Sequence, residues 1–181
     1  MSQRDFIDLI SGARRGPWAA IQRGVLRWAS WHFAAAAVTR LGLYRIGLLR
    51  KHAAPVPVIC VGNLTTGGTG KTPAVAWVVN ALLEAGRKPA IVSRGYGRRE
   101  ESLAENLEAV GNDEMRVLHE LCPGVAHVQN PDRVAGAHKA AQDGADVVVL
   151  DDGFSHVRLK RNLDILLFDA LNPFGYGRML P

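Results

Sequence analysis

Apolar and polar residues alternate along this chain in blocks that predict strands and helices in turn. Short apolar runs bounded by glycine, proline or charged residues predict buried strands. They fall at Val58–Val61, Pro89–Ser93, Val125–Val128, Ala145–Asp152 and Leu163–Phe168. Apolar residues at helical spacing predict the intervening helices, which are expected at Thr72–Ala85, Glu114–Leu121 and Pro131–Gln142. This alternation predicts an α/β fold with a doubly wound, mostly parallel sheet flanked by helices.

The N-terminal part of the chain predicts an amphipathic helical segment instead. Apolar residues recur there at steps of three and four, at Trp18, Ile21, Val25 and Trp28. Arg23 and Arg27 fall on another side of the same helix. The longest uncharged run of this N-terminal part, Trp28–Thr39, has 12 residues, which is too short to span a bilayer. We therefore expect residues 1–54 to form a helical segment and residues 55–181 to form the α/β core.

Charge is distributed unevenly between these two parts. The 181 residues carry a formal net charge of +5. Residues 1–51 hold nine Lys/Arg against two Asp, or +7, and the remainder holds 13 basic against 15 acidic residues, or −2. A helix with cations on one side and apolar residues on the other fits an anchor on an anionic membrane surface. The alternative is a helix that packs on the core with its arginines in water. No aromatic-and-basic motif accompanies the charge, so we expect no nucleic-acid partner.

Cysteine usage and the first residues indicate the compartment. The two cysteines, Cys60 and Cys122, form no disulfide framework. Asp5 and Asp8 occupy the place where a secretory signal would carry positive charge. Both features favour a reducing compartment over secretion.

A glycine-rich turn between the first strand and the next helix predicts a phosphate-binding loop. It consists of Thr65, Thr66, Gly67, Gly68, Thr69, Gly70, Lys71 and Thr72. Its glycines allow backbone N–H groups to turn inward around an anion. Lys71 would then contact the β- and γ-phosphates of ATP, and the Thr72 hydroxyl would ligate Mg²⁺. Thr65 stands where the usual pattern has a glycine, so a turn that merely joins strand to helix is the alternative.

Further polar residues follow the other expected strands. Asp151 and Asp152 end a buried-strand pattern, and Asp151 would reach the Mg²⁺ held by Thr72. The basic loop Arg94–Arg99 lies at a carboxyl strand end, where open α/β sheets bind ligands, so we expect it near the phosphates or as a solvated turn. His156 is a candidate contact to substrate or phosphate, with a structural hydrogen bond as the alternative.

Five short motifs follow one another along the chain. They are Val58–Pro73, Ser93–Gly97, Asp151–Leu159, Leu163–Ile165 and Phe174–Pro181. This series resembles the tetraacyldisaccharide 4'-kinase family, the lipid A 4'-kinases of Gram-negative bacteria. The resemblance implies a P-loop kinase that uses ATP to phosphorylate the 4'-hydroxyl of a tetraacylated glucosamine disaccharide 1-phosphate, forming lipid IVA. It also implies work at the cytoplasmic face of the bacterial inner membrane, with the amphipathic N-terminal region holding the lipid.

The resemblance implies roles for individual residues as well. Lys71 would act on the phosphates and Thr72 on Mg²⁺, while Asp151 and Asp152 would be the acidic pair near the metal. The family's Gly-Asp-Glu-Pro motif has its counterpart in Gly111–Met115, which makes Asp113 the candidate base for the sugar hydroxyl. From the residues alone, a helix N-cap before Glu114 is the alternative role of Asp113.

The chain also departs from the family pattern. Ser155 stands where the family usually has Gln and Tyr176 where it usually has Asn, so substrate contacts there are expected to differ. The family's chain continues past the equivalent of Pro181 through a second lobe, so we expect a fragment or a shortened, monomeric protein. Two other functions stay open: a nucleotide-binding remnant without catalysis, or a membrane-associated P-loop switch ATPase, although those usually carry Lys at the position of Thr66.

Overall fold

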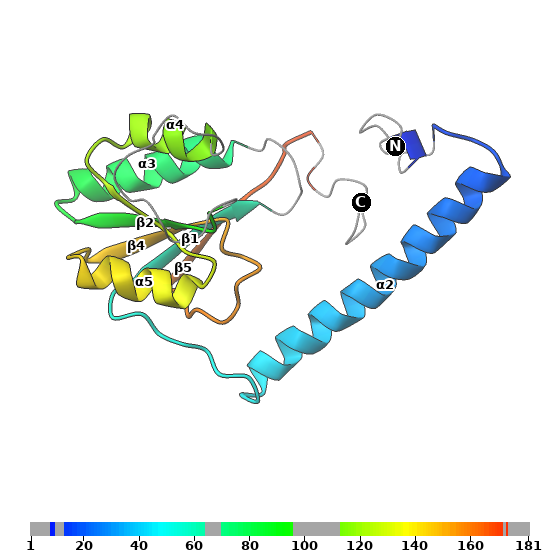
Figure 1. The fold of residues 1–181 in the computed structure, drawn as a ribbon, viewed down its shortest axis with the longest axis horizontal. Helices are drawn as coiled ribbons and strands as arrows, with labels where there is room; N and C mark the ends of the chain where they lie inside the picture. Colours follow the sequence, from blue (N-terminus) through cyan, green and yellow to red (C-terminus); the bar gives the residue numbers. More distant parts are fainter. Residues whose placement is uncertain (1–7, 10–12, 64–69, 96–112, 172, 174–181) are drawn as a thin grey trace. The chain divides into compact units, whose positions relative to one another are not determined.

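A computed structural model describes residues 8–9, 13–63, 70–95, 113–171 and 173, with residues 113 and 114 described by their backbone only (Figure 1). The chain divides into two compact units. One comprises residues 51–168, and the other comprises residues 1–50 together with 169–181. The first holds a β-sheet with its helices, and the second holds one long helix. The predicted boundary after residue 54 stays a prediction.

A five-stranded parallel sheet forms the centre of the larger unit, in the strand order β3-β2-β4-β1-β5. Its strands are β1 (Val58–Asn63), β2 (Pro89–Ser93), β3 (Ala126–Gln129), β4 (Val147–Asp151) and β5 (Leu163–Leu167). Strand β1 lies between β4, with Val61 opposite Asp151, and β5, with Asn63 opposite Leu167. Because all four pairings are parallel, the carboxyl ends of the strands meet at one edge. The predicted α/β fold with a parallel sheet is therefore confirmed.

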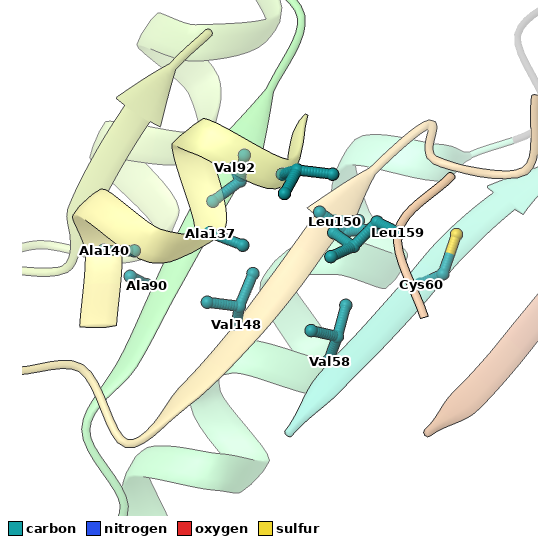
Figure 2. Packing of buried hydrophobic residues seen from close by; sticks show 10 residues of the cluster. Val58, Cys60, Ala90, Val92, Ala137, Ala140, Val148, Leu150 and Leu159 are labelled. Carbon is teal, nitrogen blue, oxygen red and sulfur yellow. The ribbon is translucent and has the colours of Figure 1, made fainter. Parts of the chain in front are cut away.

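Helices cover both faces of this sheet (Figure 1). Helices α3 (Lys71–Glu84) and α4 (Asp113–Leu121) lie on one face, and α5 (Arg133–Gln142) lies on the other. Alternate residues of the strands point to the two faces, so β4 sends Val149 toward α3 and Val148 toward α5. Figure 2 shows the packing on the α5 side, where small residues such as Ala137 and Ala140 allow the helix to approach the strands. Strands β2 and β4 are buried along their whole length, as the uninterrupted apolar runs predicted.

Glycines on α5 and β1 mark places where backbone and side chains pack without room for a Cβ. A Cβ on Gly136 of α5 would lie 2.9 Å from Cγ1 of Val92 and 3.2 Å from Cβ of Asn130. A Cβ on Gly62 of β1 would overlap the ring of Phe154. Phe154 in turn lies under the guanidinium of Arg161, whose Cζ is 5.5 Å from the ring centroid. These close approaches fix α5 and the segment after β4 against the sheet.

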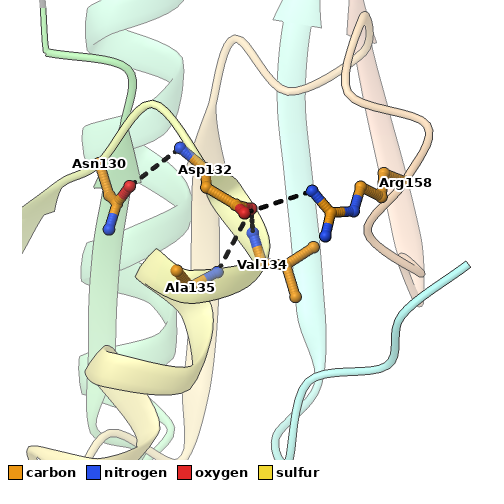
Figure 3. A network of polar contacts seen from close by, with 5 residues as sticks. All are labelled: Asn130, Asp132, Val134, Ala135 and Arg158. Atoms are coloured by element: carbon orange, nitrogen blue, oxygen red, sulfur yellow. Dashed lines mark hydrogen bonds and ion pairs between the residues drawn. The ribbon is translucent and has the colours of Figure 1, made fainter.

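The N-terminus of α5 is held by the network drawn in Figure 3. One carboxylate oxygen of Asp132 accepts hydrogen bonds from the backbone N–H groups of Val134, at 2.9 Å, and Ala135, at 3.5 Å. The other oxygen is 3.3 Å from Nη1 of Arg158, which lies in the segment after β4. Burial alone would raise the pKa of Asp132, but these amide hydrogen bonds and the charges of Arg158 and His156 outweigh it and lower the pKa. The cap thus ties α5 to the segment after β4.

The smaller unit contains α2 (Pro17–Arg45), a helix of 29 residues without a single acidic residue. Proline starts it, as is common at the first helical position. Most of its large apolar side chains are exposed, among them Trp18, Ile21, Val25, Trp28 and Trp31. Among the described residues of α2, only Ala19 and Ser30 are buried. In the part of the chain that the structure describes, no helix combines the length and the apolar character that spanning a bilayer requires.

Candidate active site

A pocket opens at the sheet edge where the carboxyl ends of β2 and β4 meet the N-terminus of α3. It is lined by Lys71, Ser93, Arg94, Gly95, Met115, His127, Arg133, Asp151, Asp152 and Ser155. All of these residues belong to the larger unit. Ligands of open parallel sheets bind at this edge, and the pocket combines three cations with two carboxylates. The geometry therefore suits an anionic ligand held together with a cation.

The predicted phosphate-binding loop is described only at its end. Thr65, Thr66, Gly67, Gly68 and Thr69 lie outside the described residues. Gly70 precedes α3 with φ 72° and ψ 29°, a left-handed conformation that glycine adopts at little cost. Lys71 is the first residue of α3, and Thr72 follows in the first turn, where it is partly exposed. The strand, the glycine turn and the helix thus occur in the order that phosphate binding at a helix N-terminus requires.

Lys71 faces the carboxyl end of β4. Its Nζ lies 3.4 Å from Oδ2 of Asp152, and the two side chains are 21% and 59% exposed. Asp152 has φ 57°, the left-handed region that aspartate enters more readily than most residues. Its backbone N–H donates to the carbonyl of Val61 at 3.0 Å, so β1 holds this turn in place. The structure thereby brings together the lysine of the predicted loop and one of the two predicted carboxylates.

The two adjacent carboxylates differ in their surroundings. Asp151 is the last residue of β4, opposite Val61, and is only 8% exposed. Asp152 turns out of the strand toward Lys71 and solvent. The described residues contain no group of three or more His, Cys, Asp or Glu that could hold a metal on their own. A magnesium ion that takes one or two carboxylates and completes its shell with phosphates and water needs no such group.

The other predicted site residues have different outcomes. Asp113 begins α4, but its side chain lies outside the described residues. His156 does not line the pocket; its backbone N–H donates to the carbonyl of Gly153, and its charge helps to lower the pKa of Asp132. Arg94 and Gly95 of the basic loop do line the pocket, while Arg98 and Arg99 lie outside the described residues. The roles assigned to Asp113 and His156 stay predictions.

The sequence assigned no role of their own to three polar residues of the pocket, Ser93, His127 and Arg133. Ser93 ends β2, and its Oγ lies 2.9 Å from Nε2 of His127 on the neighbouring strand β3. Burial, together with the charge of His119, lowers the pKa of His127 to about 4, so the imidazole is neutral near pH 7. Arg133, the first residue of α5, is only 4% exposed and donates from Nη1 to the carbonyl of Asn130 at 3.1 Å. Ser93 begins the motif Ser93–Gly97, in which it was given no role, and no sequence signal marked the other two.

The sequence matches a known family over most of its length. The family model of Tetraacyldisaccharide-1-P 4'-kinase matches residues 22–181. The chain belongs to this family. The resemblance to this family is thereby confirmed, and the switch ATPase is not favoured.

Several named members of the tetraacyldisaccharide-1-P 4'-kinase family are similar to the chain. The Tetraacyldisaccharide 4'-kinase of Anaeromyxobacter sp. (strain Fw109-5) is 43% identical over 179 residues, which cover 94% of this chain and 48% of the relative. The Tetraacyldisaccharide 4'-kinase of Halorhodospira halophila is 46% identical over 154 residues, which cover 82% of this chain and 47% of the relative. The chain thus spans about half the length of the curated relatives that it matches.

A solved structure of the family has a similar fold. The crystal structure of LpxK from Aquifex aeolicus in complex with ATP matches with a TM-score of 0.68 and 36% sequence identity. The match covers 80% of this chain and 48% of the crystallised chain. The P-loop kinase fold expected from the sequence is therefore confirmed.

Proposed function

We propose that this protein transfers the γ-phosphoryl group of ATP to the 4'-hydroxyl of a tetraacylated glucosamine disaccharide 1-phosphate, forming lipid IVA. The observation that carries the proposal is the approach of Lys71, at the N-terminus of α3, to Asp152 at the end of β4 in a member of this family. A phosphoryl transfer of this kind depends on positioning and on charge stabilisation. The pocket supplies the cations and carboxylates for both.

ATP and Mg²⁺ are the proposed cofactors. Lys71 would contact the β- and γ-phosphates, and the loop of residues 65–72 would hold them through backbone N–H groups. The residues present fit a magnesium ion, because the Thr72 hydroxyl and the carboxylates of Asp151 and Asp152 are the oxygen donors that it prefers. When bound, the ion neutralises charge on the phosphates. Asp151, being buried at a strand end, is the better-fixed carboxylate.

Asp113 is the proposed base for the sugar hydroxyl. It begins α4, whose Met115 lines the pocket two residues later. A carboxylate there needs only to orient the hydroxyl and accept its proton as the phosphoryl group arrives. His156 is proposed to contact the substrate or its phosphate.

The lipid substrate calls for contact with a membrane. We propose that α2 binds the anionic cytoplasmic face of the bacterial inner membrane as a peripheral helix. The helix has no acidic residue and exposes Trp18, Trp28 and Trp31, a combination that suits the boundary between headgroups and acyl chains. The protein is proposed to act there as a monomer.

Transfer of label from γ-labelled ATP to the lipid disaccharide tests the function. With Mg²⁺ present, the protein is expected to label the lipid, and Lys71→Ala is expected to reduce the rate by about 100-fold or more because a phosphate contact is lost. Lys139→Ala is the matched control. Lys139 is exposed and pairs with Asp143 on α5, and it does not line the pocket, so its removal is expected to leave the rate unchanged. Equal loss in both variants, or no transfer by the unaltered protein, would contradict the proposal.

A further inference from the structure

Ser93 and His127 form a polar pair on the pocket wall that the reaction as described does not use. Ser93 is the last residue of β2, and His127 lies on β3, where it is opposite Ile91. Both line the pocket together with Lys71, Arg94 and Arg133. Their side chains meet at 2.9 Å between Nε2 and Oγ. Ser93 itself is 8% exposed, so its hydroxyl has few orientations available.

The protonation of His127 determines what the serine can do. The ring is neutral, so it carries one N–H and one lone pair. Its Nδ1 is buried and has no hydrogen-bond partner among the described residues. A buried N–H without an acceptor is rarer in proteins than an unsatisfied acceptor. The proton is therefore best placed on Nε2, which then donates to Oγ of Ser93.

This arrangement leaves the serine proton available to the pocket. Oγ accepts from His127, and the part of the chain that the structure describes offers the Ser93 O–H no acceptor of its own. A phosphoryl oxygen is an acceptor only, and the cations Lys71, Arg94 and Arg133 draw such an oxygen into this pocket.

We propose that the Ser93 hydroxyl donates a hydrogen bond to a phosphoryl oxygen bound in the pocket, and that His127 is a positioning residue that orients it. The oxygen belongs to a phosphate ester or anhydride, either of the nucleotide or of the 1-phosphate on the lipid acceptor. If the oxygen belongs to the lipid 1-phosphate, the inference rests on the proposed kinase function. If it belongs to the nucleotide, the inference requires only that the pocket binds a nucleotide.

Two measurements distinguish the sources. ATP is titrated calorimetrically into the protein with Mg²⁺ and without lipid, and kcat and KM for the lipid disaccharide are measured at saturating ATP. Ser93→Ala is expected to weaken one of these by about 10- to 100-fold, the usual effect of losing a hydrogen bond to a charged group. A raised Kd for ATP assigns the oxygen to the nucleotide. A raised lipid KM or a lowered kcat with unchanged ATP binding assigns it to the acceptor side.

Variants of His127 separate positioning from a structural role. His127→Leu removes the donor at nearly constant volume and is expected to show the same loss as Ser93→Ala. Because both changes remove one hydrogen bond to the ligand, the double variant is expected to be no worse than either single variant. His127→Gln places an amide N–H near the position of Nε2 and is expected to stay within about threefold of the unaltered protein. His138→Gln, on α5 and outside the pocket lining, is the matched control.

The results of these measurements test the role of Ser93 separately from the proposed kinase function. If Ser93→Ala stays within about twofold of the unaltered protein in both measurements, the inference is wrong even though the kinase is active. Additive losses for Ser93→Ala and His127→Leu would also overturn the positioning role. If the unaltered protein binds ATP but transfers no phosphate, the proposed function fails, and the ATP titration alone then decides the role of Ser93. An unaltered protein that binds no ATP overturns both.

Discussion

Asp151 and Asp152 are adjacent in the chain, yet they have different physical tasks. Asp151 is held at the buried end of β4, whereas Asp152 leaves the strand with a left-handed backbone and reaches Lys71. An ion pair this exposed is worth at most about 1 kcal/mol. A nucleotide phosphate carries more charge than a carboxylate. It can therefore replace Asp152 as the partner of Lys71 at a small cost in free energy. The sequence predicted both carboxylates, but it could not distinguish them, because the turn after β4 depends on its hydrogen bond to Val61.

We predict that titration of His127 contributes to the pH dependence of the protein's stability. Its pKa is lowered to about 4 in the folded protein, against 6.5 for an ordinary histidine. Between these values the unfolded chain binds the proton and the folded protein does not, so stability falls as the pH drops from about 6.5 to 4. At and above pH 7 the contribution is fully present. The loss attributable to this one group amounts to about 3 kcal/mol.

Chemical unfolding of the protein and of His127→Gln between pH 4 and 7 measures this effect. The variant is expected to lose less stability than the unaltered protein over this range, since the other titrating groups are shared. Parallel stability curves for the two proteins would show that His127 titrates normally and is not buried as described.

The secondary-structure elements followed from the pattern of apolar residues with small errors at their ends. The predicted helix Thr72–Ala85 occurs as Lys71–Glu84, and the predicted strand Val125–Val128 occurs as Ala126–Gln129. The order of the strands did not follow, because pairing between distant strands depends on how the helices fill both faces. For this reason the sequence did not predict His127 as a pocket residue, since its partner Ser93 belongs to a different strand that pairs with β3.

A substitution at the end of β1 tests how tightly the segment after β4 is packed. Gly62→Ala is expected to destabilise the protein by about 1–3 kcal/mol, because the new methyl group overlaps the Phe154 ring and must displace it. The displaced ring would also lose its contact with Arg161. Thermal or denaturant unfolding measures the change.

Gly24→Ala on α2 is the control for adding a Cβ. Nothing lies within 4 Å of the position where its Cβ would be, and alanine favours a helix interior, so stability is expected to stay the same or rise slightly. If Gly62→Ala were as harmless as Gly24→Ala, the described packing of Phe154 would be incorrect.

At the scale of the whole molecule, the two units differ in the features that they carry. The basic, tryptophan-rich helix α2 belongs to one, and the pocket belongs to the other. The helix was predicted from its periodicity. The choice between membrane anchor and packed helix could not be made from the sequence, because both need the same apolar stripe. The anchor therefore stays a proposal that a binding measurement decides.

Binding to lipid vesicles tests whether α2 is a membrane anchor. The protein is expected to bind vesicles that contain anionic lipid and to bind them less at high salt. Trp28→Ala is expected to weaken binding by about 10-fold, because a large apolar side chain is lost from the boundary layer.

Trp77→Ala supplies the matched control. Trp77 is 71% exposed on α3, compared with 63% for Trp28 on α2, so both variants remove an exposed tryptophan. Only the α2 variant is expected to weaken vesicle binding. Equal effects in both variants, or binding indifferent to lipid charge, would rule out α2 as the anchor.

The position of the transferred phosphate tests the central proposal most directly. After incubation with ATP, Mg²⁺ and the tetraacylated disaccharide 1-phosphate, the lipid product is analysed by mass spectrometry and by phosphorus–proton correlation NMR. We predict a single added phosphoryl group, bonded to the 4' oxygen, and no product with Lys71→Ala. A phosphoryl group at another position, or ATP hydrolysis with the lipid unchanged, would contradict the account.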